Sequence, residues 1–245
     1  MTEFAGRTAV ITGGGSGMGR ELVRLLVAEA CNVAMCDVSP TGLAETQRLC
    51  EAAGLPQGLR VTTHIVDVAN RTQVERFRDE VADRHQTDKI HLLFNNAGIS
   101  GGGSMVTNSR DEWERTFNIC WGGVYNCTRA LLPMLQNAEE GHIVNTSIIN
   151  GFWASVGPRI PHTAYSAAKF AVKGFTEGAD HRSADQRAAH QMLGRHARPD
   201  RDLDPRQHAQ DPERRSRIGR DRCCRSRAGA RPICFAGPRR LAAVG

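Results

Sequence analysis

The sequence predicts a three-layer α/β/α fold in which helices cover both faces of a doubly wound parallel sheet. Three observations support this class. Short apolar runs alternate with helical segments through residues 1–177, the first run enters a glycine-rich turn, and 245 residues suit one such domain or two small ones. A hydrophobic fraction of 40% provides a sizeable core, which excludes a wholly disordered or collagen-like chain.

Five strands are expected, because five short runs have the length and the apolar, β-branched content of buried strands. They cover residues 7–12, 32–37, 61–66, 90–94 and 141–147. Five helices are expected after them, because apolar residues recur there at helical spacing. They cover residues 21–30, 40–53, 71–84, 113–135 and 164–176. The third helix is highly charged, and Val74, Phe77 and Val81 are expected on its inward face. Alternating strands and helices imply parallel pairing through right-handed crossovers.

A glycine-rich turn follows the first strand and leads at once into the first helix. Only glycine lets a backbone turn so tightly and lets a pyrophosphate approach a helix N-terminus, where amide groups and the helix dipole favour anions. A glycine-rich loop by itself would equally suit a flexible linker, but the flanking strand and helix favour a dinucleotide site. The candidate cofactor-binding residues of this turn are Gly13, Ser16, Gly17, Met18 and Gly19.

Asp37 ends the second expected strand and is the residue expected to select the dinucleotide. A carboxylate at this position accepts hydrogen bonds from both ribose hydroxyls and repels a 2′-phosphate, which favours NAD over NADP. The alternative is structural, in which Asp37 caps the turn before Pro40.

Five motifs lie in order along residues 5–177. They are Thr12-Gly-x-x-x-Gly-x-Gly19, Asp67-Val68, Asn95-Asn-Ala-Gly98, Asn118 and Tyr165-x-x-x-Lys169. Together they resemble the short-chain dehydrogenase/reductase family, which has a Rossmann-type fold. The resemblance implies an oxidoreductase that transfers a hydride between NAD and a secondary alcohol or ketone. It further implies roles for individual residues: Asp67 and Val68 hold the adenine, Asn95, Ala97 and Gly98 lie beside the cofactor, and Asn118 joins the proton relay.

Tyr165 and Lys169 are the candidate catalytic pair, one helical turn apart on the same face. A free phenol has a pKa of about 10, too high for proton exchange at neutral pH, but a nearby ammonium favours the phenolate. Tyr165 would then exchange a proton with the substrate, and Lys169 would also hold the ribose, as the resemblance implies. Taken by itself, a Tyr–Lys pair at this spacing is more often a surface hydrogen bond.

One position within these motifs departs from the family's pattern. The family's catalytic serine lies three residues before Gly151, where this chain has Ile148, and the hydroxyl of Ser147 lies one residue earlier. Because successive strand residues point to opposite faces, Ser147 would need a bulge or slip to take that place, so it is a weak catalytic candidate. Loss of such a hydroxyl lowers rates by about two to three orders of magnitude. The alternative function is therefore a catalytically impaired dinucleotide-binding protein.

Residues 178–245 differ from residues 1–177 in composition, which predicts two regions. The first region carries 16 basic and 18 acidic residues, whereas the second carries 16 arginines, no lysine and 8 acidic residues. The second is so poor in apolar residues that a disordered or non-native tail is expected, without the further strands that the resemblance implies. The hypothesis is a one-base frameshift near codon 178. A genuine disordered extension and an arginine-rich nucleic-acid arm are the alternatives.

Other kinds of site and partner find little support in the sequence. No apolar run reaches the ~18 residues of a membrane span and no secretory signal opens the chain, so a cytoplasmic protein that binds neither membrane nor nucleic acid is expected. The eight cysteines lack CxxC spacing and predict reduced thiols, and no histidine motif suggests a metal site. Phe152 and Trp153 would suit a moderately apolar substrate. Homotetramers are common in the family, and the altered C-terminus is expected to weaken one here.

Overall fold

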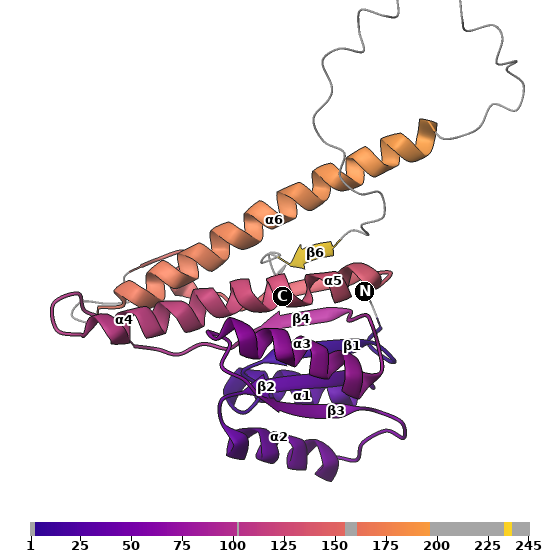
Figure 1. Cartoon of the computed structure of the whole chain (residues 1–245), viewed down its shortest axis with the longest axis horizontal. Helices are drawn as coiled ribbons and strands as arrows, with labels where there is room; N and C mark the ends of the chain where they lie inside the picture. Colours follow the sequence, from indigo (N-terminus) through magenta and orange to yellow (C-terminus); the bar gives the residue numbers. More distant parts are fainter. Residues whose placement is uncertain (1–2, 102, 155–160, 197–232, 237–245) are drawn as a thin grey trace, which may run out of the picture.

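A parallel sheet of six strands runs through the centre of the chain (Figure 1). This computed structural model describes residues 3–101, 103–154, 161–196 and 233–236, with side chains as far as residue 179. The strands are β1 (Thr8–Thr12), β2 (Asn32–Asp37), β3 (Val61–Ile65), β4 (Leu92–Asn95), β5 (Gly141–Asn145) and β6 (Ile233–Ala236). They lie in the order β3-β2-β1-β4-β5-β6, and all neighbours pair in parallel. The order reverses between β1 and β4, which is where sheets of this kind bind ligands at the carboxyl ends of their strands.

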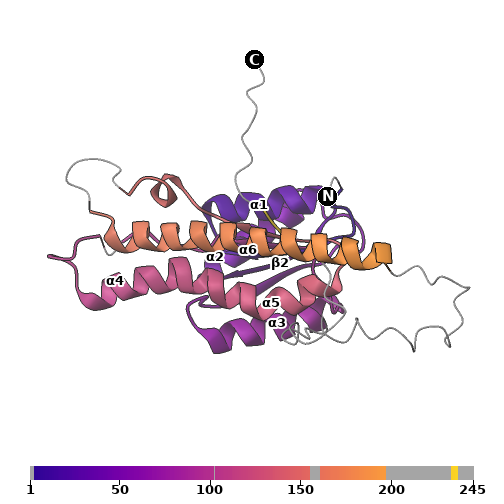
Figure 2. The ribbon, with the colours of Figure 1, turned by 90° about the horizontal axis from the view of Figure 1, so that it is seen from above.

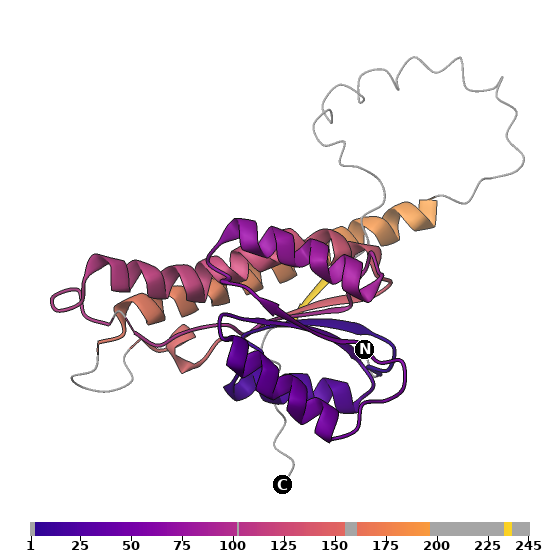
Figure 3. The same cartoon turned by 60° about the horizontal axis from the view of Figure 1, so that its bottom comes forward.

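Helices cover both faces of the sheet, as Figure 3 shows. They are α1 (Gly17–Ala28), α2 (Pro40–Ala52), α3 (Arg71–His85), α4 (Arg110–Phe117), α5 (Gly123–Asn137) and α6 (Thr163–His196). One layer contains α1 and α2, and the other contains α3, α5 and α6. Seen from above in Figure 2, α6 lies side by side with α4 and α5. The predicted fold class is confirmed.

The alternation of side chains along each strand divides the core into two clusters. Along β1, Val10 packs with residues of α3 and α5, while the next residue, Ile11, packs with α1 and α2 on the opposite face. The predicted inward face of α3 is confirmed, because Val74, Phe77 and Val81 are all almost completely buried. Burial of each such side chain contributes about 1.5–3 kcal/mol relative to exposure.

The long helix expected at residues 113–135 is interrupted in the structure. A five-residue π-helical turn, Asn118–Gly122, separates α4 from α5. The backbone of Gly123 passes so close to Val68 that a Cβ added there would lie 2.6 Å from Val68 Cγ2. The widened turn therefore lies where the helix crosses the segment that follows β3. Such turns occur frequently at functional sites.

The sequence predicts no further helix or strand after residue 177, but the structure contains both. Helix α6 continues to His196, and β6 adds four residues to the edge of the sheet beside β5. Residues 178–196 contain several alanine, arginine and glutamine residues and no proline, so helix propensity extends α6 although apolar residues are few. The sequence of β6, Ile-Cys-Phe-Ala, is a short apolar run within a polar region. Residues 197–232 and 237–245, to which the tail prediction also applies, lie outside the described residues.

In the part of the chain that the structure describes, no helix is both long enough and apolar enough to span a bilayer.

Candidate active site

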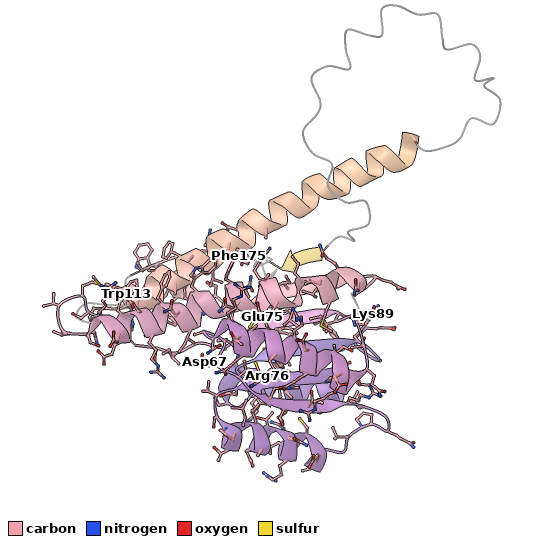
Figure 4. The ribbon with its side chains drawn as sticks, viewed as in Figure 1. Asp67, Glu75, Arg76, Lys89, Trp113 and Phe175 are labelled. Carbon is pink, nitrogen blue, oxygen red and sulfur yellow. The ribbon has the colours of Figure 1, made fainter. Side chains whose placement is uncertain are left out.

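A cavity of about 690 Å³ opens at the carboxyl ends of the strands, beside the switch point between β1 and β4. Its walls come from the glycine-rich turn, the segments after β2, β3 and β4, and the start of the π turn. In Figure 4, Asp67 lies toward the end of the molecule where α4 carries Trp113, whereas Lys89, which precedes β4, lies at the opposite end. The sequence-predicted residues that line the cavity are Gly13, Ser16, Gly17, Met18, Asp37, Asp67, Val68, Ala97, Gly98 and Asn118.

The glycine-rich turn is shaped by backbone contacts that exclude side chains. Gly13 has a φ of +72°, and a Cβ at that residue would lie 2.9 Å from Ala97 Cα. A Cβ at Gly19 would overlap the carbonyl oxygen of Gly13. The turn therefore packs backbone against backbone, which only glycine permits at these positions. By contrast, Gly17 has open space around its Cα at the first residue of α1.

The N-terminus of α1 lacks the side-chain cap that the next three helices possess. Ser39, Asn70 and Ser109 each accept a hydrogen bond from a backbone amide in the first turn of α2, α3 and α4, respectively. Ser16 makes no such bond, and the first turn of α1 contains no acidic residue. The amide groups at this helix end therefore face the cavity without an internal acceptor, which is an arrangement that suits a bound anion.

Thr12 joins the glycine-rich turn to the segment after β4. Its Oγ1 accepts hydrogen bonds from the backbone amides of Asn96 and Ala97, each at 3.0 Å. The side chain of Asn96 donates back to the Thr12 carbonyl at 3.1 Å. These bonds hold two walls of the cavity at a fixed separation.

Asp37 lies at the end of β2 with its carboxylate on the cavity wall. Its Oδ2 accepts from the amide of Gly15 and its Oδ1 accepts from the amide of Ser39, both at 3.0 Å. The structural alternative considered from the sequence, a cap on the turn before Pro40, is thus present in the geometry. The same carboxylate also fixes the glycine-rich turn, and its cavity-facing position leaves it available to a ribose.

Asp67 and Val68 form the wall that follows β3. Asp67 Oδ1 accepts from the amide of Ala69 at 2.9 Å, while its own amide donates to Gln73 Oε1. Val68 is 5% exposed and packs against Gly123. Between them they present a carboxylate and an apolar surface, which together suit a flat heterocycle with amino groups.

Asn95 differs from its neighbours because it points into the protein. It is 3% exposed, and its Nδ2 donates to Thr128 Oγ1 and to Asn145 Oδ1 at 3.1 and 2.8 Å. Asn145 continues this network to Thr176 of α6. Asn95 therefore joins β4, β5 and two helices, and it is not among the residues that line the cavity.

Tyr165 and Lys169 come together on the first turns of α6. The ammonium of Lys169 lies 5.5 Å from the centroid of the Tyr165 ring and donates to the Thr146 carbonyl at 2.8 Å. Lys169 is only 3% exposed, and burial lowers the pKa of its ammonium. Burial also raises the pKa of Tyr165, with a smaller contribution in the same direction from Cys120. This direction is opposite to the lowering expected from the sequence, because burial is the main influence on Tyr165 and the ammonium of Lys169 donates to the Thr146 carbonyl.

The π turn places Cys120, and not Asn118, beside this pair. Asn118 is exposed and lines the cavity, but no hydrogen bond joins it to Tyr165 or Lys169 in the described part of the chain. Cys120 is fully buried, and its charge interactions involve both Lys169 and Tyr165. Sequence reasoning missed Cys120 because a buried cysteine within an amphipathic helix has the pattern of an ordinary core residue.

Ser147 and Ile148 lie beyond the end of β5, which stops at Asn145. Strand alternation therefore does not fix the direction of Ser147, in contrast to the expectation from sequence. Ser147 Oγ is buried, has no hydrogen-bond partner among the described residues, and lies where a Cβ on Gly151 would overlap it. It thus packs under the short turn at Ile149–Gly151 and, like Tyr165 and Lys169, is not among the residues that line the cavity. The side chain of Ile148 is 40% exposed.

Two further features complete the site. Arg115 of α4 lines the cavity, and sequence reasoning missed it because a cation on a charged helix face usually points to solvent. Phe152 and Trp153 are 55% and 67% exposed, so both present apolar surface before α6. No group of three or more metal-ligating side chains gathers among the described residues.

Comparison with known proteins relates this geometry to one family. A family model described as short chain dehydrogenase matches residues 7–189. SadH of Mycobacterium tuberculosis, which is named as an oxidoreductase, is 41% identical over 177 residues, covering 72% of this chain and 60% of SadH. The chain therefore spans well under two thirds of the length of this relative.

Two solved structures contain a dinucleotide. A short-chain dehydrogenase/reductase from Burkholderia phymatum in complex with NAD is 35% identical, with a TM-score of 0.66 over 74% of this chain and 61% of that one. A metagenomic short-chain oxidoreductase in complex with NADP is 26% identical, with a TM-score of 0.64 over 74% of this chain and 78% of that one. The similar structures thus include both an NAD and an NADP complex.

Proposed function

The chain belongs to the short-chain dehydrogenase family, and on that premise we propose that it transfers a hydride between NAD and a secondary alcohol or the corresponding ketone. Tyr165 is the proposed proton donor or acceptor. The observation that carries this proposal is the position of Gly98, which lines the cavity and also lies against Lys169 Nζ. Gly98 therefore lies between the dinucleotide-sized cavity and the Tyr165–Lys169 pair, whose two residues are not among those that line the cavity.

The residues present fit a dinucleotide along the whole cavity. The uncapped N-terminus of α1 would bind the pyrophosphate, Asp37 the ribose of the adenosine, and Asp67 with Val68 the adenine. Lys169 would hold the second ribose near Gly98. NAD supplies a hydride acceptor at its nicotinamide ring when bound.

The protein's own contribution is a buried phenol next to a buried ammonium. Because burial raises the pKa of Tyr165, the phenol carries its proton at neutral pH and is ready to donate it to a ketone. For alcohol oxidation the same hydroxyl must first lose that proton, and the ammonium of Lys169 would have to turn from the Thr146 carbonyl toward the phenolate oxygen to stabilise it. The exposed rings of Phe152 and Trp153 favour a moderately apolar substrate.

The preference for NAD is tested by the charge of Asp37. We expect the parent chain to bind NAD at least about tenfold more tightly than NADP, since a 2′-phosphate would meet this carboxylate. Asp37→Asn keeps an acceptor oxygen but removes the charge, so the ratio of the two dissociation constants should move toward NADP. Asp37→Ala should weaken NAD binding, and Asp83→Ala, an exposed acidic residue on α3, is the matched control. Calorimetric titration measures the dissociation constant of NAD for each protein. If Asp37→Ala has the same dissociation constant as the parent chain, Asp37 does not bind the ribose.

A second function, a dinucleotide-binding protein with impaired catalysis, is favoured by Ile148. The side chain at this position has no hydroxyl to polarise a carbonyl, and the nearest one, on Ser147, is buried elsewhere. Ile148→Ser separates the two functions. A rise of about tenfold or more across a panel of secondary alcohols would localise the defect to this residue. If the variant stays inactive while it binds NAD, the second function takes precedence.

We propose further that the segment after residue 177 arose from a shifted reading frame. The change from a charge-balanced region to one with 16 arginines supports this. The coding DNA through codons 170–245 tests it. A neighbouring frame that encodes an apolar strand followed by Pro-Gly is expected, and the lack of one in any frame would make the segment a genuine extension.

A further inference from the structure

Cys120 is a titratable group beside the site, and the proposed function does not use it. It lies in the middle of the π turn, is 0% exposed, and its Sγ donates to the Ile99 carbonyl at 3.3 Å. This bond joins the π turn to the segment after β4. Because Ile99 lines the cavity and Cys120 does not, the thiol lies behind the cavity wall.

The thiol and the ammonium of Lys169 converge on the same point of that wall. A Cβ placed on Gly98 would lie 3.6 Å from Cys120 Sγ and 3.9 Å from Lys169 Nζ. Gly98 thus leaves a space that Sγ and Nζ border together. Among the described residues, Lys169 and Tyr165 of α6 are the titratable groups that interact with Cys120, and the segment after β4 contributes the Ile99 carbonyl.

We propose that Cys120 is a positioning residue for the Tyr165–Lys169 pair, because its buried thiol, fixed by the Ile99 carbonyl, borders the same space at Gly98 as the ammonium of Lys169. The inference rests on the proposed function, in which Tyr165 moves the proton. As a neutral thiol, Cys120 faces the same space at Gly98 as Lys169 without competing for the ammonium's charge. As a thiolate it would compete for that charge and repel the phenolate, so its ionisation opposes that of Tyr165.

The chain contains two tyrosines, Tyr125 and Tyr165, which permits a direct measurement. In the full-length Tyr125→Phe chain, the tyrosinate absorbance band reports the ionisation of Tyr165 without any catalytic turnover. Cys120→Ser keeps a donor for the Ile99 carbonyl and removes the ionisable thiol. We expect it to lower the pKa of Tyr165 by about half a unit, the size of a screened interaction between neighbouring charges.

Cys127→Ser is the matched control, because Cys127 is also fully buried and lies one heptad further along, in α5. It should leave the titration of Tyr165 unchanged. Cys120→Ala provides a second test should the serine variant fold poorly, and the same direction of shift is expected. Overlapping titration curves for the parent and both Cys120 variants would overturn the proposal, as would an equal shift in Cys127→Ser. An inactive enzyme that shows the expected shift would overturn the proposed function and leave this coupling intact.

Discussion

The candidate site has two parts, the dinucleotide-sized cavity and the Tyr165–Lys169 pair beside it, and they are built in different ways. At the dinucleotide end, the walls are mainly backbone: glycines that exclude side chains, an uncapped helix N-terminus, and a carboxylate fixed by two amides. At the Tyr165 end, the site depends on individual side chains, with a buried thiol beside Lys169 and an isoleucine at position 148. Backbone recognition requires a set of glycines, whereas proton chemistry requires one particular group at each point. A chain can therefore keep its dinucleotide-binding glycines while its proton-transfer residues depart from the family's pattern.

The largest effect is expected from breaking the backbone at the dinucleotide end. In Gly19→Ala the new methyl group overlaps the Gly13 carbonyl, so the turn must open and its amides lose their alignment. We expect NAD binding to weaken by about 100-fold or more, because several hydrogen bonds to a charged group, each of ~1.5–3 kcal/mol, are lost together. Gly174→Ala is the matched control, because the space around Gly174 is open. Titration with NAD measures both, and parental affinity in Gly19→Ala would show that the turn does not bind the dinucleotide.

A large effect confined to catalysis is expected from Tyr165→Phe. The variant keeps the ring over which Lys169 lies and removes the proton. Turnover should fall by about 100-fold or more, the usual size of general acid–base catalysis, while the dissociation constant of NAD stays within about threefold. Tyr165→Phe is introduced into the parent chain or into the Ile148→Ser variant, whichever has the higher turnover, and is compared with that protein. Undiminished turnover would contradict the proposed role of Tyr165, and loss of NAD binding would show that the two ends are not separable.

A pH-dependent loss of stability is expected between β3 and α3, where His64 and His85 are buried. Thr62 Oγ1 lies 2.9 Å from His64 Nε2 and 2.8 Å from His85 Nε2, and His64 Nδ1 lies 2.7 Å from Glu80. Burial lowers the pKa of His85 to about 4 and also lowers the pKa of His64.

Because the folded state disfavours the protonated ring, this stability is fully present above the unfolded value of about 6.5 and is lost as the pH falls toward 4. Urea unfolding should show a decrease on the order of 2–3 kcal/mol over that window, and His85→Gln should reduce it. A slope that is the same in both proteins would exclude His85 as the cause.

The smallest effect is expected from Ser147→Ala. Within the described part of the chain its hydroxyl is buried without a partner, so removing it is expected to cost no hydrogen bond and to relieve the desolvation of a polar group. The free energy of unfolding should stay the same or rise by up to about 1 kcal/mol, and turnover should change by less than about twofold. Gly151→Ala, which would collide with the same hydroxyl, is the destabilising counterpart. A large loss of turnover in Ser147→Ala would show that Ser147 takes part in catalysis.

Much of the fold could be read from local patterns. The second strand begins and ends where it was predicted, at Asn32–Asp37, and α3 buries the predicted apolar face. The interruption of the long helix could not be predicted, because residues 118–122 have no local signal for a wider turn. That turn arises where Gly123 meets Val68, two residues that are 55 positions apart in the sequence.

The candidate site divides in the same way. The sequence by itself determined the alternation of strands and helices, the glycines of the turn, and the presence of Asp37, Tyr165 and Lys169, since these depend on residue type and short spacing. Only the tertiary structure decided that Asn95 points inward, that Ser147 is buried away from the cavity, and that Cys120 rather than Asn118 lies beside Lys169. The physical reason is that these positions depend on where β5 ends, where a helix widens, and how α6 packs against both. Such contacts join residues distant in sequence, and no local spacing encodes them.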